Sequence, residues 1–542
     1  MSEADTLTCS VRDGVPSGTA PGCRQPHPYL ALRLRGEVDM EVLQRSYETV
    51  VSRHRILGDG RACASIRVRS MPLCSDSSVW LEAAVREETW RPFEACDALL
   101  RVVLLRLDEQ TTAAGESVAL FVLDASVADE WSLCLVQHEF HLLYTAGRQG
   151  DAEPLPPLSM QYADCAEAMD ADADAIAYWL AQCSVPGAGS LQWATHAEYL
   201  PAAMARSHID ADLRNRLAAI ARSYRTSLFS LLHAAFAVLL YRHDKRADVL
   251  IGVPVSGRLS LESEPLIGRF ARLLPLRYRL HQDMSFAEVL HGSHDSLREA
   301  YRHQQVSGDA LHAAWQLAYP DTAMPAPQAQ CLMCDAEQAS MDWAGLEVDV
   351  MEPICAYAAS PLELRIGDGG DGLSLQWTFA TALFDAADIG ALSVKFEQLL
   401  AGIARHPAAV IAMLDQSAAD PAARLPQPAA PVHMTRVSAP PSTPNERALA
   451  RIWANNLHLE LAQIGVTDNY FDIGGDSLRT ISLVASIRNT LQAQISIADI
   501  FSHPTIQQLA GHLAGAARAA PARSETADSK NRILRARQRL QN

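Results

Sequence analysis

The chain has 542 residues, of which 49% are hydrophobic and 20% are charged, and its formal net charge is −17. This length corresponds to about three or four compact units of ordinary globular composition, and the acidic balance argues against nucleic acid as a partner of the main body. The longest apolar stretch, residues 227–241, is interrupted by Ser230 and His233 and is too short to cross a bilayer, and residues 1–14 lack the apolar core of a signal peptide. The sequence therefore predicts a cytoplasmic protein without a membrane partner.

Strand and helix patterns alternate through the first three quarters of the chain. Alternating or compact apolar runs predict strands at residues 29–39, 118–126 and 248–258. Apolar residues at helical spacing predict helices at residues 40–54 and 213–243. This mixture indicates a layered α/β fold.

Patterns that could indicate metal or nucleotide binding are incomplete. The eleven cysteines have no regular spacing, as is typical of reduced thiols, and Cys331 and Cys334 form one CxxC without a matching second pair, which leaves a zinc or redox site as the minor alternative. Residues 170–174 (DADAD) imitate the start of a calcium loop, but Ala175 stands where its turn glycine belongs. Residues 367–372 (GDGGDG) lack the spacing of a phosphate loop and indicate a hairpin turn. We therefore predict no metal site.

A linker divides the chain into two folded parts. Residues 416–442 are rich in proline, alanine and serine and have no apolar period, which predicts a semi-extended tether. Residues 443–515 begin with the signals of a helix N-terminus, because Thr443 can cap it and Glu446 follows three residues later. We then expect a long loop, a second helix, a short turn at residues 496–505 and a last helix, together forming a small all-α bundle.

The second of these helices begins behind an unusual loop, in the stretch YFDIGGDSLRTISLV at residues 470–484. Gly474 and Gly475 let the chain turn without a Cβ penalty, and Ser477 follows at the entrance of the helix. Because the amides and dipole of a helix N-terminus stabilise negative charge, this position suits a hydroxyl that carries a phosphate ester. Two alternatives are a plain helix cap and the nucleophile of a GDSL-type esterase, which would also need a base and an oxyanion hole.

The last segment, residues 516–542, has a positive net charge in an otherwise acidic chain, with seven Lys or Arg against two acidic residues. It is a basic tail whose end could form a short helix with Ile533, Ala536 and Leu540 on one side. The alternatives are a solubilising tail and a docking segment for an acidic surface.

Residues 443–515 resemble the acyl or peptidyl carrier proteins of thiotemplate synthetases. Three segments follow the family's order: IWANNLHLE, IGVTDNYFDIGGDSLRTISLV and IADIFSHPTIQQLAGHL. The family's G-G-D-S-L serine, here Ser477, receives 4′-phosphopantetheine from coenzyme A through a phosphopantetheinyl transferase. The resemblance therefore implies a four-helix carrier bundle and a pantetheine thiol that holds an acyl or aminoacyl group as a thioester.

Residues 26–415 resemble the condensation domain of nonribosomal peptide synthetases, a two-lobed α/β relative of chloramphenicol acetyltransferase. The resemblance follows collinear segments that include LALRLRGEVD, SRHRIL, IGVPVSGR, LIGRFARLLPLR and FATALFDA. It implies an N-lobe at residues 26–175 and a C-lobe at residues 176–415, preceded by a divergent segment at residues 1–25 that lacks the family's substrate-channel motif.

The family's active-site motif, HHxxxDG, is altered here. The aligned stretch, residues 124–132, is DASVADEWS, so Asp124 and Ala125 occupy the two histidine positions. In the family the second histidine assists attack of the acceptor amine on the donor thioester, and a positioned general base is worth roughly 10²- to 10⁴-fold in rate. Asp124 is the alternative base, but a carboxylate with the usual pKa of about 4 is a weak base for an ammonium group. We assign no catalytic residue.

Other positions of the family's motifs are altered as well, while one structural residue is kept. Asp129 keeps the family's structural aspartate, and we expect it to pair with Arg258. Glu130 replaces the family's glycine, which predicts a narrowed or rebuilt tunnel, Arg272 replaces an asparagine, and HQQVSGD (residues 303–309) replaces the family's HQxxPFE.

The resemblance implies a role in the biosynthesis of a secondary metabolite such as an antibiotic. The chain would be the carrier of a nonribosomal peptide or hybrid polyketide assembly line, with an inactive condensation-like domain as a platform, somewhat as in the X domains of glycopeptide synthetases. The alternative is an active amide- or ester-forming enzyme with unconventional residues. Expected partners are an adenylation domain or upstream module and downstream or tailoring enzymes that act in trans.

Overall fold

The structure is a computed structural model that describes residues 26–519 with internal gaps. The gaps are residues 59–64, 73–75, 95–96, 108–115, 168–172, 185–199, 336–340 and 415–438, and the single positions 307, 321, 323, 328, 355, 359, 370, 458 and 476. The predicted N-terminal segment, nearly all of the predicted linker and most of the predicted basic tail lie outside the described residues.

The first lobe is built on a six-stranded sheet with the order β2-β3-β4-β1-β10-β9. Its strands are β1 (Tyr29–Arg35), β2 (Arg67–Ser70), β3 (Leu100–Arg106), β4 (Glu116–Leu123), β9 (Met341–Asp342) and β10 (Glu347–Val350). Its helices are α1 (Met40–Arg53), α2 (Ser77–Trp90) and α3 (Glu130–Gln149), with a 3₁₀ turn at Arg55–Leu57. Alternate residues of β4 pack with α1 and α3 on one face and with α2 on the other, as period two requires.

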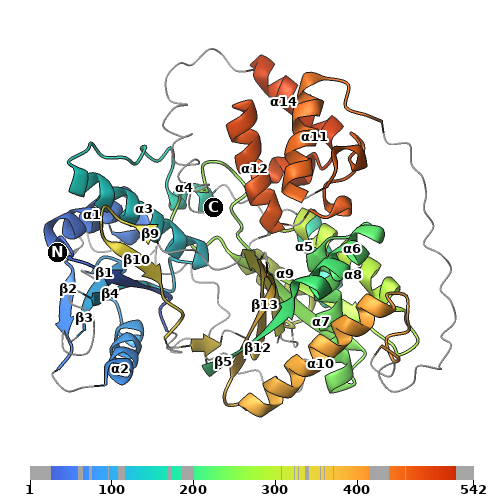
Figure 1. The fold of residues 1–542 in the computed structure, drawn as a ribbon, viewed down its shortest axis with the longest axis horizontal. Coiled ribbons are helices and arrows are strands. Elements are labelled where there is room, and N and C mark those ends of the chain that lie inside the picture. Colours follow the sequence, from blue (N-terminus) through green and yellow to red (C-terminus); the bar gives the residue numbers. More distant parts are fainter. Residues whose placement is uncertain are drawn as a thin grey trace.

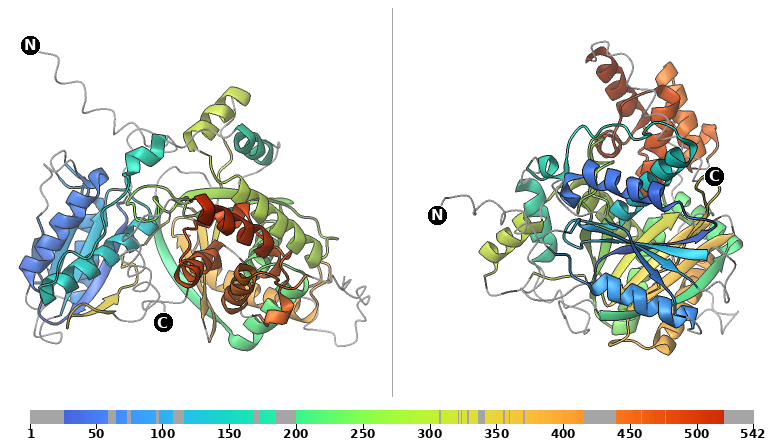
Figure 2. Two further views of the ribbon diagram at one scale, coloured as in Figure 1. Left: turned by 90° about the horizontal axis from the view of Figure 1, so that it is seen from above. Right: turned by 90° about the vertical axis from the view of Figure 1, so that its left-hand side faces the viewer.

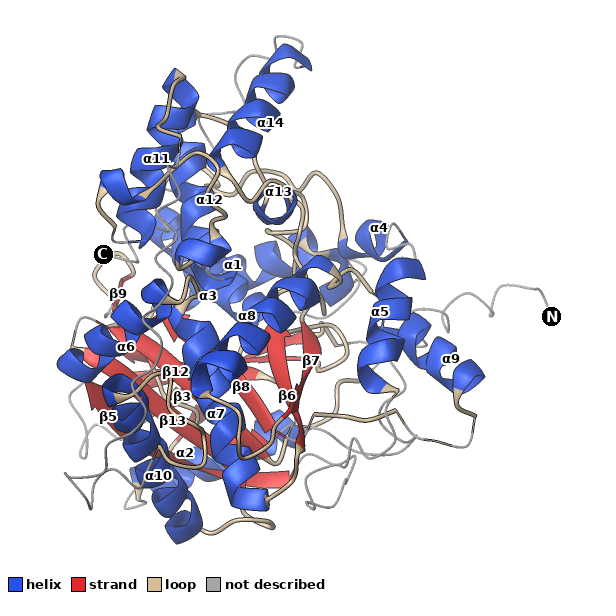
Figure 3. Ribbon diagram, turned by 90° about the vertical axis from the view of Figure 1, so that its right-hand side faces the viewer, coloured by secondary structure: helices blue, strands red, loops and turns tan. Residues whose placement is uncertain are grey.

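The second lobe is built on a seven-stranded sheet with the order β11-β5-β13-β12-β8-β6-β7. Its strands are β5 (Leu200–Asp210), β6 (Asp248–Val255), β7 (Arg272–Arg279), β8 (Ala329–Asp335), β11 (Ala356–Ala358), β12 (Leu362–Gly369) and β13 (Gly372–Ala380). Its helices are α6 (Ala211–Ser223), α7 (Leu228–Asp244), α8 (Phe286–Arg302) and α10 (Ala386–Arg405), with α4 (Tyr162–Glu167), α5 (Ala173–Cys183) and α9 (Gly308–Ala318) nearer the junction (Figures 2 and 3).

The apolar stretch at residues 227–241 forms α7, the central helix of this lobe. Residues 228–240 are all buried in the main hydrophobic core, which explains a helix that is apolar on every side. No single helix in the described part of the chain could span a membrane, and α6 and α7, which satisfy the criterion only as a pair, are bent by 102° relative to each other. The predicted hairpin at residues 367–372 is confirmed by the pairing of β12 with β13.

Two strands of the first sheet come from a part of the chain that the sequence analysis assigns to the second lobe. Strands β9 and β10, at residues 341–350, lie in the range expected for the C-lobe, yet β10 pairs antiparallel with β1, with Leu32 opposite Val350. The chain therefore crosses back to complete the N-lobe sheet, which ties the two lobes together.

The C-terminal bundle contains α11 (Pro444–Leu457), α12 (Ser477–Leu491), α13 (Ile497–Ser502) and α14 (Ile506–Ala519), with 3₁₀ turns at Leu461–Gln463 and Phe471–Ile473. The predicted cap is confirmed, because Thr443 Oγ1 accepts from Glu446 N at 3.2 Å and the Glu446 carboxylate accepts from Thr443 N at 2.9 Å. The predicted turn at residues 496–505 is wrong in part, since Ser496 and Asp499 form a capping box that starts the short helix α13. Figure 1 shows the bundle, coloured orange to red, against the second lobe beside α6 and α8.

Candidate functional site

The glycine loop before α12 is held by a tyrosine. Gly474 has a φ of +116°, which favours glycine, and Gly475 N donates to Tyr470 O at 2.9 Å. A Cβ on Gly475 would lie 2.3 Å from the Tyr470 ring, so a larger residue would displace the loop. Tyr470 is itself fixed, because its hydroxyl donates to Asn456 Oδ1 at 2.6 Å. Tyr470 therefore holds Gly474 and Gly475 in place, and α12 begins at Ser477.

The surroundings of Ser477 fit a phosphate ester. The opening amides of α12 offer hydrogen-bond donors and the positive end of the helix dipole. The residues present can thus hold the phosphate of a phosphopantetheine arm, which supplies a thiol for thioester chemistry.

The bundle is seated on the second lobe through ion pairs at separate points. Arg488 of α12 binds Glu264 with two hydrogen bonds of 2.8 Å, and both side chains are at most 15% exposed. The Glu264 carbonyl also accepts from Trp131 Nε1 of α3 at 3.1 Å. The loop at Glu264 therefore contacts both the first lobe and the bundle.

A second contact lies beside the glycine loop. Asp472 Oδ1 lies 3.1 Å from His294 Nε2 of α8, and His294 Nδ1 lies 3.4 Å from the Ser230 hydroxyl at the start of α7. The Phe501 ring of α13 packs against Tyr301 of α8, with ring centroids 5.5 Å apart. The polar and aromatic contacts together fix the bundle over α8.

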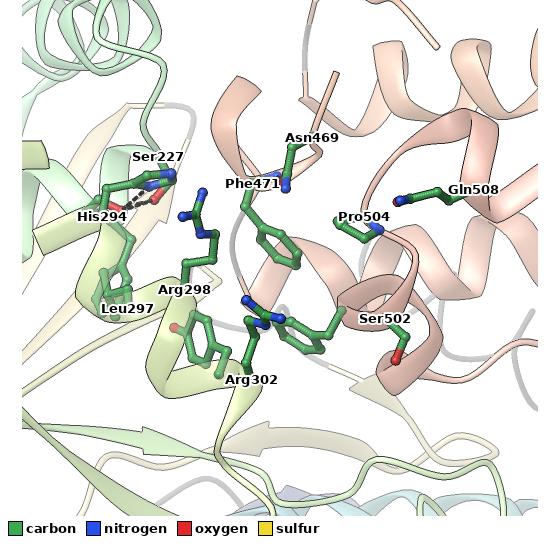
Figure 4. A pocket seen from close by; sticks show the side chains of 15 residues that line it. Ser227, His294, Leu297, Arg298, Arg302, Asn469, Phe471, Ser502, Pro504 and Gln508 are labelled. Carbon is green, nitrogen blue, oxygen red and sulfur yellow. Dashed lines mark hydrogen bonds between the residues drawn. The ribbon is translucent and has the colours of Figure 1, made fainter. Parts of the chain in front are cut away.

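A cavity of about 330 Å³ lies between the two parts (Figure 4). Side chains of α8, including His294, Arg298 and Arg302, line one side, and Phe471, Pro504 and Gln508 of the bundle line the other. Gly475 of the attachment loop also lines it.

The two positions expected to hold histidines lie at the end of β4. Asp124 Oδ1 accepts from Ser126 N at 2.9 Å and from the Ser126 hydroxyl at 2.5 Å, so the carboxylate caps its own turn. Ala125 offers only a methyl group. A histidine from elsewhere lies beside them: His27 Nδ1 accepts from Ala125 N at 3.2 Å and lies 3.9 Å from Asp124 Oδ2.

Sequence reasoning missed His27, because it precedes β1 by two residues and no local pattern marks it. Burial lowers its pKa despite the nearby Asp124 carboxylate, so the ring is neutral at physiological pH. A neutral imidazole has one acceptor nitrogen, and here that nitrogen is already occupied by the Ala125 amide. His27 Nε2 then carries the proton, so in this arrangement neither ring nitrogen of His27 is free to accept one.

Asp129 has the structural role that the sequence predicts. Its two oxygens accept from Arg258 at 2.8 and 3.0 Å, and both side chains are at most 4% exposed. The carboxylate also caps α3 through Ser132 N and accepts from Phe270 N and Ala271 N. Burial opposes ionisation of Asp129, but the Arg258 and Ser132 donors outweigh it and lower its pKa. The predicted Asp129–Arg258 pair is confirmed, and it joins α3 to the second lobe.

The other departures from the family form new bonds across or beside the junction. Glu130 Oε1 lies 2.8 Å from Arg365 NH1 of β12, and Arg365 lies 3.6 Å from Glu363 of the same strand. Arg272 donates to Gln304 O at 3.0 Å and to Val306 O, so two altered motifs bind each other. An ion pair therefore joins the first residue of α3 to β12.

The CxxC pair lies on β8, where Cys331 is buried and burial raises the pKa of its thiol. Among the described residues no group of three or more His, Cys, Asp or Glu side chains could hold a metal ion.

Comparisons with known proteins agree with this architecture. The family model named Condensation domain matches residues 81–422, and the one named Phosphopantetheine attachment site matches residues 447–513. A linear gramicidin synthase protein of Brevibacillus parabrevis is 30% identical over 416 residues, 71% of this chain and 8% of that protein. Cyclosporin synthetase simA of Tolypocladium inflatum is 26% identical over 395 residues, 68% of this chain and 2% of that protein. The chain thus matches only a small fraction of the length of these relatives.

Solved structures show the same fold. The X-domain from teicoplanin biosynthesis is 25% identical with a TM-score of 0.61, over 72% of this chain and 92% of that one. The first condensation domain of the calcium-dependent antibiotic synthetase is 18% identical with a TM-score of 0.57, over 72% of this chain and 94% of that one. These likenesses confirm the two-lobed fold predicted from the sequence.

Proposed function

The chain belongs to the condensation-domain family of nonribosomal peptide synthetases and carries a phosphopantetheine attachment domain, and from this premise we propose that it holds an acyl or aminoacyl intermediate as a thioester on Ser477. The cofactor is covalently bound 4′-phosphopantetheine. The observation that carries the choice of Ser477 is its place as the first residue of α12, behind a glycine loop whose shape Tyr470 fixes.

The condensation-like domain does not catalyse condensation in this proposal. Ala125 has no group that accepts a proton, His27 uses its acceptor nitrogen on a backbone amide, and the Asp124 carboxylate caps a turn. An active enzyme that uses unconventional residues is the alternative, and no described contact favours it.

The domain acts instead as a platform that positions the carrier for other proteins. The support for this role is the docking of the bundle on the second lobe, which the Arg488–Glu264 pair and the Asp472–His294 contact maintain. A phosphopantetheinyl transferase and other synthetase modules are implied by the two domains. We further propose that loading occurs from an adenylation domain or upstream module and that tailoring enzymes act in trans.

Intact-mass spectrometry tests the attachment site. With coenzyme A and a broad phosphopantetheinyl transferase, the full chain gains the mass of one phosphopantetheine, and Ser477→Ala gains none. Ser502→Ala, an exposed serine of the same bundle, is the matched control and gains the mass. Modification that persists in Ser477→Ala would overturn the assignment.

An assay for amide formation tests whether the condensation-like domain lacks condensation activity. The loaded chain, supplied with donor and acceptor thioesters, gives no amide above the rate of Ser477→Ala mixed with the same substrates. Rapid product formation that survives Asp124→Ala would reveal a base elsewhere and refute the platform.

A further inference from the structure

The cavity between the carrier bundle and α8 has both apolar and hydrogen-bonding walls (Figure 4). Its volume of about 330 Å³ falls within the range of about 300–1,000 Å³ that is typical of small-ligand sites. On the apolar side, the rings of Phe471 and Phe501 stack with centroids 5.0 Å apart, and Tyr301 packs against Phe501. The hydroxyl and amide side chains that line the cavity are Ser227, Ser230, Asn469 and Gln508. A ligand that fits these walls combines apolar surface with several hydrogen-bonding groups.

The two guanidinium groups of the cavity already have acidic partners. Arg298 lies 3.8 Å from Asp472 of the bundle and 3.6 Å from Asp295 of its own helix. Arg302 lies 3.3 Å from Glu299. Because these carboxylates offset the positive charges, the walls favour a neutral ligand over an anion.

The attachment loop forms part of the cavity wall. Gly475 lines the cavity, and Ser477 follows it by two residues. Consecutive Cα atoms lie 3.8 Å apart, so the Cα atoms of these two residues are separated by at most about 7.6 Å. A pantetheine arm is longer than this separation and has many rotatable bonds, so the cavity lies within its reach.

We propose that this cavity holds the pantetheine arm of Ser477 while the carrier is docked on the second lobe. Beyond its phosphate the arm is neutral, its geminal dimethyl group suits the aromatic wall, and its hydroxyl and two amides need the hydrogen-bonding partners that the other wall offers. The inference rests on the proposed attachment at Ser477. It has two consequences: the thiol is shielded during docking, and pantetheinylation shifts the carrier toward the docked arrangement, because only that arrangement forms the cavity.

Photocrosslinking locates the arm directly. A broad phosphopantetheinyl transferase loads the full chain from a coenzyme A analogue whose arm ends in a diazirine, and peptide mapping follows irradiation. We expect crosslinks to α8 and to the start of α7, which supply the wall opposite the bundle. The absence of crosslinks to both helices would overturn the proposal.

Thiol alkylation tests the cavity with a matched pair of variants. Iodoacetamide is added to the pantetheinylated full chain, and the rate is read from the mass of the peptide that contains Ser477. If the arm occupies the cavity for about 70–90% of the time, Gln508→Trp, which fills the cavity from an exposed position, should raise this rate about three- to tenfold. Gln507→Trp changes the neighbouring exposed residue, which lies outside the cavity wall, and should keep the wild-type rate. Equal rates for the two variants would contradict the proposal, and the crosslinks of the wild-type chain decide the case in which Gln508→Trp disturbs docking itself.

Intact mass separates this inference from the proposed function. If Ser477 gains phosphopantetheine but the diazirine arm reaches neither α7 nor α8, the arm is held elsewhere, and attachment at Ser477 still stands. If no mass is gained at Ser477, the proposed function itself fails.

Discussion

Replacing Asp129 by alanine tests whether its role is structural. The carboxylate is bound by Arg258, which is fully buried, and by the backbone amides of Ser132, Phe270 and Ala271. Removing one partner of a buried ion pair costs about 3–5 kcal/mol, because a buried charge is left uncompensated. Arg258 keeps its bonds to the carbonyls of neighbouring residues, so we expect the lower part of this range.

Thermal unfolding of the full chain measures the effect. At about 2–4 °C per kcal/mol, Asp129→Ala should lower the unfolding temperature of the condensation-like domain by about 6–12 °C. Glu130→Gln is the matched control: its carboxylate is next in the chain and pairs with Arg365, but it is 66% exposed, so its loss should cost about 1 kcal/mol or less.

The effect of Asp129 should depend on pH in a predictable direction. Because its pKa is lower in the folded state, its stabilisation is complete above the unfolded pKa of about 3.9 and is lost as the pH falls through the lower folded value. The stability difference between the wild type and Asp129→Asn should therefore be constant from pH 5 to 7 and shrink below pH 4. Equal unfolding temperatures for Asp129→Ala and Glu130→Gln at pH 7 would refute the structural role.

Three further substitutions probe the carrier and the junction. Glu264→Gln removes the charge that binds Arg488, so the docking of the bundle on the second lobe should weaken by about ten- to a hundredfold, measured by small-angle scattering; an unchanged compact profile would contradict this. Gly475→Ala places a methyl group against the Tyr470 ring and should slow pantetheinylation and lower the melting temperature of the bundle, and wild-type values for both would refute the fixed loop. Ala125→His alone should give no condensation, because Asp124 and Glu130 still replace two other residues of the family's motif; product from this variant would show that the missing imidazole alone accounts for the loss.

Local signals made much of the fold predictable from the sequence. The strand predicted at residues 118–126 and the helical range predicted at residues 213–243 are recognisable from their apolar runs, although the structure divides the second range into α6 and α7. The helix start at Thr443 was identified because its capping bonds join residues three apart. These features depend on neighbours in the chain, which is why one sequence suffices to reveal them.

Features that depend on distant residues were not predictable. The return of β10 to the first sheet joins residues more than 300 positions apart, and no periodicity records that pairing. His27 lies in no motif, and its contact with Ala125 arises only when β1 and β4 pair. The seat of the carrier depends on single side chains such as Glu264 and His294, which look like ordinary surface residues in the sequence.

Two residues that differ from the family's motifs, Glu130 and Arg272, are bound by other parts of the fold. Glu130 extends a charge toward β12 and is met there by Arg365, and Arg272 fills its site by binding the carbonyl groups of Gln304 and Val306. Each substitution is thus compensated within the fold, and Asp129 still links α3 to the second lobe. These contacts keep the two lobes joined whatever chemistry the domain retains, and they are the structural basis on which we propose that it holds a carrier.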